Sequence, residues 1–246
     1  MNLSIAPNAK VPFRIVHGDE DLLVVEKPAG VVTQPGKKHE RTSLLNGLFA
    51  TYGNLLQNLG EARDWGLLHR LDRETSGLIV VALTKSAYDH LLDQFKRRIV
   101  KKVYWAIVFG TPKPLQGVIQ KPIREAVGAR KRAVIDRAGQ QAITAYRVLQ
   151  SADEVSLIEA RPKTGRLHQI RVHLADMGHP LLGETDYAGK IRLPNVRRLC
   201  LHEAELSVLQ PTSGHRLTFS LPWPADLKGV LSKYGLAEPG GGGAPE

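Results

Sequence analysis

The sequence predicts an α+β fold with a mixed, mostly antiparallel sheet and flanking helices. Segments with strand character outnumber helical ones, and the two do not alternate as they do in a doubly wound α/β protein. The 246 residues are 42% hydrophobic and 24% charged, as in a globular chain with a real core. We expect one domain over residues 13–236, an N-terminal extension over 1–12 and a disordered, Gly/Pro-rich tail over 237–246.

The first expected elements follow from apolar spacing and turn composition. Apolar and β-branched residues at 13–16 and 22–26 flank Gly18-Asp19-Glu20-Asp21, which predicts a hairpin. Residues 78–83 are a continuous apolar run of strand length. Residues 85–98 then place apolar side chains three, four and seven apart, which predicts an amphipathic helix packed beside a buried strand.

The later elements are mainly strands. Residues 103–109 alternate, with Trp105 in one row and Tyr104 in the other, so these two side chains should face opposite ways. Further strands are expected at 141–149, 155–160, 201–209 and 216–221. A helix is expected at 167–177, ended by Gly178 and Pro180.

Charge and cysteine content restrict the partner and the compartment. The chain has 34 basic and 24 acidic side chains, a net charge of +10 and a pI near 9.8, which favours a polyanion such as nucleic acid. The single Cys200 excludes an internal disulfide and a zinc site built on cysteine pairs, and it fits the cytoplasm. We expect no signal peptide and no membrane span, hence a soluble protein, and a monomer.

Several motifs fail on spacing. Residues 183–190 (GETDYAGK) lack the glycine spacing and the Ser or Thr of a phosphate-binding loop, and HRLD at 69–72 is not a kinase HRD. His168 and His173 are five residues apart, without a third metal ligand at a familiar spacing. We therefore expect no nucleotide hydrolysis, no kinase activity, no metal and no cofactor.

The segment HRLDRETSG at 69–77 carries the strongest chemical signal. Asp72 stands between Arg70 and Arg73 in a polar loop just ahead of the buried strand. A rigid strand can hold the carboxylate while nearby cations keep it ionised, which suits a nucleophile. The ordinary alternative is a surface turn with Asp–Arg pairing of little energetic weight.

Four other motifs accompany it in order, between residues 13 and 221: EKPAG at 26–30, KVY at 102–104, KTGRLHQIRVHL at 163–174 and LCLH at 199–202. Together with HRLDRETSG they are similar to the signatures of the RluA-type pseudouridine synthases, which isomerise uridine to pseudouridine in transfer and ribosomal RNA. The resemblance implies the pseudouridine synthase fold, with a central catalytic cleft and RNA as partner.

The resemblance also implies roles for individual residues. Asp72 matches the aspartate that attacks the target nucleoside, at the base or at the sugar. Tyr104 matches the tyrosine that stacks on uracil with its hydroxyl near the proton on C5, and Arg166 the basic residue that pairs with the aspartate. Arg70 matches the residue that enters the RNA where the uridine leaves it, and Leu201 a leucine packed against the base. Without the motifs, each would be an ordinary core or surface residue.

Two residues depart from the family motifs. Glu203 stands where the family has alanine after the histidine, and Glu184 replaces the aspartate of a Gly-Asp pair. We expect both to affect local packing rather than activity. Only residues 1–12 precede the first strand, so we expect no N-terminal RNA-binding module, and target choice should depend on the catalytic domain or on partners.

RNA contacts are expected from long loops at 51–64 and 121–138 and from basic clusters at 37–38, 96–98, 101–102, 130–132 and 197–198. Two other function classes stay open. One is an RNA-binding protein of this fold without catalysis. The other is a hydrolase that uses Asp72 on a small substrate.

Overall fold

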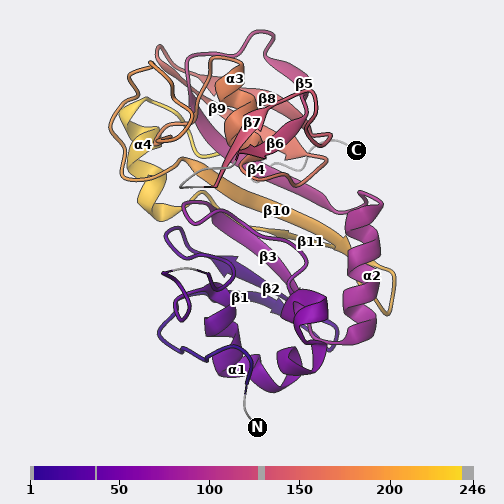
Figure 1. Ribbon diagram of the computed structural model, residues 1–246. Coiled ribbons are helices and arrows are strands. Elements are labelled where there is room, and N and C mark those ends of the chain that lie inside the picture. Colours follow the sequence, from indigo (N-terminus) through magenta and orange to yellow (C-terminus); the bar gives the residue numbers. More distant parts are fainter. Residues whose placement is uncertain (1–2, 37, 127–130, 240–246) are drawn as a thin grey trace. The chain divides into compact units, whose positions relative to one another are not determined.

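The computed structural model describes residues 3–36, 38–126 and 131–239, and it has the α+β architecture expected from the sequence (Figure 1). The chain forms two compact units. Unit 1 comprises Met1–Lys101 and Glu205–Leu221, and unit 2 comprises Lys102–Ala204 and Pro222–Glu246. The domain limits expected at residues 13 and 236 do not coincide with the limits of these units.

Unit 1 is built on a β-sheet. The expected hairpin is present as β1 (Arg14–Gly18) and β2 (Leu22–Lys27), and the apolar run forms β3 (Ser76–Ala82), which is buried throughout. β2 pairs antiparallel with β3 from Leu22 opposite Ala82 to Lys27 opposite Gly77. The order is β1-β2-β3-β10, and β11 (Arg216–Ser220) pairs with residues 205–209 of β10 (Leu201–Leu209).

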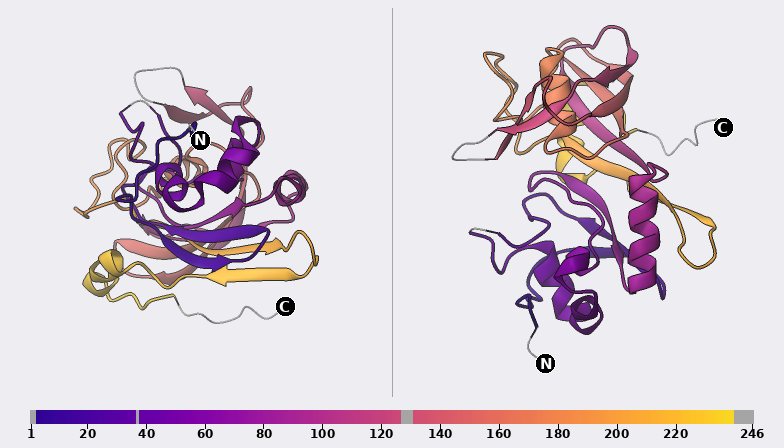
Figure 2. Two further views of the ribbon diagram at one scale, coloured as in Figure 1. Left: turned by 90° about the horizontal axis from the view of Figure 1, so that it is seen from below. Right: turned by 45° about the vertical axis from the view of Figure 1, so that its right-hand side comes forward.

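The helices of unit 1 lie beside these strands (Figure 2). The expected amphipathic helix is α2 (Lys85–Lys96), which begins at Thr84, whose side chain accepts the N–H of Ala87. Tyr88 and Leu91 of α2 are buried. A second helix, α1 (Leu44–Leu59), begins at a capping box in which Ser43 and Asn46 each accept the other's backbone N–H.

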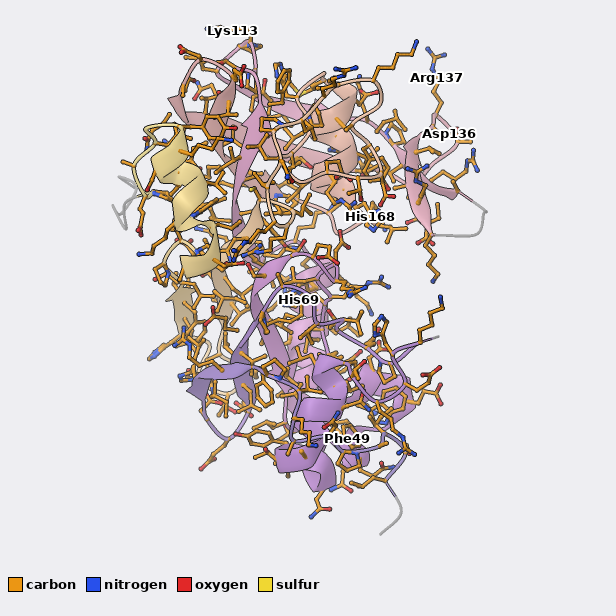
Figure 3. All side chains as sticks on the ribbon, turned by 90° about the vertical axis from the view of Figure 1, so that its left-hand side faces the viewer. Phe49, His69, Lys113, Asp136, Arg137 and His168 are labelled. Carbon is orange, nitrogen blue, oxygen red and sulfur yellow. The ribbon has the colours of Figure 1, made fainter. Side chains whose placement is uncertain are left out.

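The prediction of a loop at 51–64 is wrong. Residues 51–59 form the C-terminal part of α1, and a 3₁₀ segment, η1 (Glu61–Gly66), follows. α1 also anchors the N-terminal extension, because Asn46 Nδ2 donates to the Ala6 carbonyl over 2.7 Å and Ser4 exchanges hydrogen bonds with Gln57. Leu48 and Leu56 of α1 are fully buried, and Phe49, labelled in Figure 3, is 2% exposed.

Unit 2 holds a second antiparallel arrangement. Its order is β10-β4-β9-β8-β5, beginning with the first four residues of β10. The expected strands are found as β4 (Lys101–Phe109), β8 (Ile143–Ser151) and β9 (Val155–Pro162), and β5 (Gln116–Gln120) is added at the edge. Ile107 and Trp223 belong to a core cluster on which Trp105 packs, as the alternation along this strand predicts.

The prediction of a second loop, at 121–138, is wrong as well. It contains the paired strands β6 (Ile123–Ala126) and β7 (Arg132–Ile135), whose Ile123 and Ala133 pack with Val172 of α3 (Gln169–Asp176). α3 is the helix expected at 167–177. A last helix, α4 (Lys228–Lys233), follows the 3₁₀ segment η2 (Ala225–Leu227).

Two further expectations concern the tail and the basic clusters. Ala237, expected in the disordered tail, exchanges two hydrogen bonds with Gln150, and residues 240–246 lie outside the described residues. Lys37 and Arg130 of the basic clusters also lie outside them. Arg198 is a structural residue, since its guanidinium makes two hydrogen bonds to Asp226 and is 9% exposed. None of the described helices combines the length and the apolar character needed to cross a bilayer.

Candidate active site

Asp72 lies in unit 1, in the segment that leads into β3. This segment runs along β3, because Leu67 forms an antiparallel bridge with Val81 and the N–H of Val80 donates to His69 Nε2 over 3.1 Å (Figure 3). Asp72 itself is half-buried. β3 therefore fixes the position of the chain segment that precedes Asp72.

The residue before Asp72 is held by a side chain. The Thr33 hydroxyl donates to the Leu71 carbonyl over 2.8 Å and accepts the Leu71 N–H over 3.1 Å. Thr33 is 4% exposed and Leu71 is 5% exposed. A single hydroxyl thus satisfies both buried backbone groups of Leu71, as a neighbouring strand would.

The residue after Asp72 is held by the motif at 26–30. The Nζ of Lys27, fully buried, donates to the carbonyls of Pro28 (2.9 Å), Val31 (2.6 Å) and Arg73 (3.3 Å). The Gly30 N–H donates to the same Arg73 carbonyl over 2.7 Å. The backbone is therefore fixed on both sides of the carboxylate, which reduces the reorganisation a reaction would require.

Gly77 allows this arrangement. Its φ is +136°, a conformation that side-chain-bearing residues rarely adopt, and it pairs with Lys27 at the end of the β2–β3 ladder. Thr75 and Ser76 beside it are buried. The motifs at 26–30 and 69–77 are therefore side by side because the sheet pairs their strands.

The two arginines that flank Asp72 differ. Arg73 donates from Nε to the Gly30 carbonyl over 3.2 Å and lies 3.6 Å from the carboxylate of Glu74. Its contacts in unit 1 therefore bind it to the glycine turn. Arg70 is exposed, as a residue that enters RNA would need to be.

In unit 2, Tyr104 lies on β4 and is 7% exposed. Its hydroxyl donates a hydrogen bond to Glu203 Oε2 on β10. Glu203, expected to matter only for packing, is therefore the direct partner of a predicted site residue. The sequence gives one signal for it: a carboxylate where the family motif has alanine.

Burial dominates the electrostatics of this pair. Glu203 is 0% exposed, and burial raises the pKa of its carboxyl to about 7, against the Lys102 charge and the Tyr104 hydrogen bond, which both lower it. Burial likewise lowers the pKa of Lys102, and the charge of Glu203 opposes this. Lys102, expected in a surface cluster, is half-buried and acts on Glu203.

Arg166 lies in the loop between β9 and α3. Its N–H and the Thr164 hydroxyl both donate to Gln169 Oε1, over 3.1 and 2.7 Å, and the Gln169 amide donates to Thr144 Oγ1 over 2.9 Å. Its Nε donates to the Gln141 carbonyl over 3.1 Å. The loop is therefore ordered by Gln169 of the motif. The pairing of Arg166 with Asp72 stays a prediction.

Leu201 is the first residue of β10 and is 4% exposed. The Ile107 N–H of β4 donates to the neighbouring Cys200 carbonyl over 3.2 Å, which aligns the two strands. Leu201 and Tyr104 therefore belong to neighbouring strands of unit 2. A role for Leu201 against the base stays a prediction.

The other departure, Glu184, is explained by a buried ion pair. Its two oxygens accept hydrogen bonds from Nε and Nη2 of Arg171, each over 2.8 Å, and Asp186 lies 3.1 Å from the same Nη2. The Arg171 guanidinium also lies over the Tyr187 ring at 5.2 Å. This contact joins α3 to the loop at 184–187, and an effect on packing rather than on activity stays a prediction.

In the part of the chain that the structure describes, no group of three or more His, Cys, Asp or Glu side chains is arranged to hold a metal ion. The chemical groups in these units include a braced aspartate in unit 1 and a Lys–Tyr–Glu cluster in unit 2, in which the tyrosine and the glutamate are buried. Thr33 and Glu203 are the contributors that motif reasoning did not assign.

Comparisons with known proteins agree with the motifs. The family described as RNA pseudouridylate synthase matches residues 21–176, a range that contains Lys27, Asp72, Tyr104 and Arg166. An uncharacterized RNA pseudouridine synthase of Synechocystis is 36% identical over 226 residues, covering 90% of this chain and 68% of that protein. Ribosomal large subunit pseudouridine synthase D of Zymomonas mobilis is 38% identical over 227 residues, covering 89% and 71%.

Solved structures give the same result. The human protein RNA Pseudouridylate Synthase Domain Containing 4 matches with a TM-score of 0.73 at 27% identity, over 92% of this chain and 95% of that one. Human RNA Pseudouridylate Synthase Domain Containing 1 matches with a TM-score of 0.67 at 27% identity, over 89% and 86%. The fold and the motifs therefore agree.

Proposed function

We propose that this chain, which belongs to the RNA pseudouridylate synthase family, acts on uridines of ribosomal RNA with Asp72 as its nucleophile. Members of the family are isomerases that act on RNA. The reaction breaks the bond between ribose C1′ and uracil N1, turns the base and rejoins it through C5, so no second reactant is consumed. A carboxylate can act covalently in such a step, at the base or at the sugar.

The other site residues are assigned around this nucleoside. Arg166 keeps Asp72 ionised and oriented, because a guanidinium favours the charged form of a nearby carboxyl. Tyr104 stacks on the uracil, and its hydroxyl faces the C5 proton. Leu201 packs against the base, and the planar Arg70 fills the space in the RNA that the flipped nucleotide leaves.

One observation supports the assignment of Asp72 above all: the backbone on both sides of it is held by buried groups. Thr33 binds Leu71 and Lys27 binds Arg73. A solvent-exposed turn with weak surface ion pairs would not need its backbone to be held by buried groups. A nucleophile does, since a misplaced carboxylate loses the advantage of orientation.

The direct test measures tritium release from RNA labelled at C5 of uracil. The wild-type protein should release tritium from ribosomal RNA, and Asp72→Asn should release none, because the amide is no nucleophile. Asp153→Asn, a change of the same kind at an exposed position in unit 2, is the matched control and should keep full activity.

The outcomes separate the function classes. Release that survives Asp72→Asn contradicts the assigned nucleophile. RNA binding without release from any RNA supports a binding protein, and turnover of a small substrate without RNA supports a hydrolase.

Ribosomal RNA is proposed as substrate because several relatives are named for the ribosomal large subunit. Mapping pseudouridines in a strain that lacks this protein should reveal missing sites in large-subunit RNA. Missing sites in transfer RNA alone would contradict this choice. We place the activity in the cytoplasm, in keeping with the single cysteine and the RNA substrate.

A further inference from the structure

A carboxylate is buried on β10 beside Tyr104. Glu203 is 0% exposed, on the strand next to β4, and it accepts the hydrogen bond of the Tyr104 hydroxyl. Burying an ionisable group is costly unless it is paired. An acidic residue in this position, bonded to the tyrosine assigned to uracil, therefore requires a reason beyond packing.

Ionisable groups beside Glu203 can exchange a proton with it or stabilise its charge. Among the described residues of unit 2, Lys102 and Tyr104 on β4 act on the charge of Glu203, and His202, its neighbour along β10, is buried. Lys102 Nζ lies 4.0 Å from the place that a Cβ at Gly165 would occupy, so the loop bearing Lys163 and Arg166 packs against it. One cation thus faces both the carboxylate and the motif at 163–174.

We propose that Glu203 is a positioning residue that accepts the phenolic proton of Tyr104 while the tyrosine oxygen removes the proton from C5 of the uracil. The inference rests on the proposed function, since it takes Tyr104 to face that proton. A phenol alone is a weak base at neutral pH because it is protonated there. An ionised carboxylate bonded to its O–H overcomes this limit, as a general base does for a nucleophile.

The step balances without an oxidant or a reductant. Once the new C1′–C5 bond has formed, the C5–H bond breaks and its electron pair becomes the C5=C6 double bond. The C6=N1 pair takes up a proton from water at N1. The tyrosine oxygen receives the C5 proton as its own proton passes to Glu203, which later returns it to water.

The pH dependence of the reaction follows from this role. Only the ionised carboxylate can accept the phenolic proton, and burial raises the pKa of this carboxyl to about 7. The rate of C5 proton removal should therefore rise with pH across neutrality and level off above it. Glu203→Gln keeps the size of the side chain but removes the titrating group, so its profile should lose this limb.

The experiment uses the full chain and measures single-turnover tritium release across this pH range. Glu203→Gln should release tritium about 10²-fold more slowly at high pH, the lower end of what general acid–base catalysis contributes. It should also show a larger isotope effect for deuterium at C5, because proton removal becomes slower than the other steps. A merely structural residue would change neither the profile nor the isotope effect.

Glu205→Gln, two residues further along β10 and half-buried, is the matched control and should behave as wild type. Circular dichroism checks that each variant is folded. Should Glu203→Gln misfold, Glu203→Ala, which also removes the carboxyl group, should show the same loss of the pH limb. A wild-type profile and isotope effect in a folded Glu203 variant overturn the inference.

An activity-independent measurement separates this inference from the proposed function. Infrared titration of the wild-type protein should show a buried carboxyl band that is absent in Glu203→Gln and shifts in Tyr104→Phe. Such a band in a protein that modifies no RNA overturns the proposed function and leaves the pairing intact. If the protein is active but its carboxyl band does not shift in Tyr104→Phe, the inference is overturned and the proposed function stands.

Discussion

Two buried glutamates of this chain differ in their ionisation because their partners differ. Burial raises the pKa of Glu184. Three effects outweigh it: two hydrogen bonds from Arg171, the charge of Arg171 and a hydrogen bond from the Asp186 N–H. The net pKa of Glu184 therefore lies below the ordinary value. Glu203 accepts the hydrogen bond of the Tyr104 phenol and is influenced by the charge of Lys102, but burial outweighs both and raises its pKa to about 7. For Glu184 the Arg171 partner outweighs burial, whereas for Glu203 burial outweighs its partners.

This difference predicts a pH-dependent stability for Glu203. Its folded pKa is above the unfolded value, so the folded state binds the proton more tightly, and the stability this confers is lost as pH rises through about 7. At about 1.4 kcal/mol per pKa unit, the loss is on the order of 3 kcal/mol.

Urea denaturation at acidic and alkaline pH measures the free energy of unfolding and so checks the predicted loss of stability. Glu203→Gln should gain stability relative to wild type as pH is raised, since the amide has no charge to bury. A constant difference between the two proteins at all pH values would contradict the raised pKa. Glu205→Gln should show no such trend.

At the scale of elements, the Arg171–Glu184 pair joins α3 to the loop at 184–187. Glu184→Ala should destabilise the protein by about 3–5 kcal/mol, because it leaves a buried guanidinium without its main partner. Glu184→Asp, which restores the residue of the family motif, should be better tolerated. Thermal denaturation of both variants tests this, and a loss for Glu184→Asp as large as that for Glu184→Ala would contradict it.

α1 shows why one element was missed. Gly47 and Gly53 weaken helix propensity, and neither resembles a helix-forming position in isolation. In the structure, a Cβ at Gly47 would lie 3.1 Å from Phe13 and Val11, and one at Gly53 would lie 3.1 Å from Leu3. These glycines admit the N-terminal segment to the helix surface, a contact that no local pattern contains.

For the whole molecule, the net charge of +10 predicts salt-dependent RNA binding. The logarithm of the association constant should fall with the logarithm of salt concentration, with a slope of about −0.7 for each phosphate contacted on single-stranded RNA. Filter binding over a range of salt concentrations measures this slope.

A single-charge variant refines the measurement. Arg70→Gln should make the slope less steep by about 0.7 if this exposed side chain contacts a phosphate. Arg14→Gln, which lies outside the basic clusters and whose guanidinium pairs with Glu26 on β2, is the control and should leave the slope unchanged. An affinity that ignores salt would contradict electrostatic binding by this basic chain.

The sequence alone determined the α+β class, the order of most strands and the family, because hydrophobic periodicity and motif spacing are local properties. It also pointed to Asp72, Tyr104 and Arg166, whose roles in the reaction stay predictions. Only the tertiary structure revealed that Thr33 and Lys27 hold the residues around Asp72, and that Glu203 is bonded to Tyr104. These contacts join residues 38, 46 and 99 positions apart, and burial, which decides their energetics, exists only once the strands have paired.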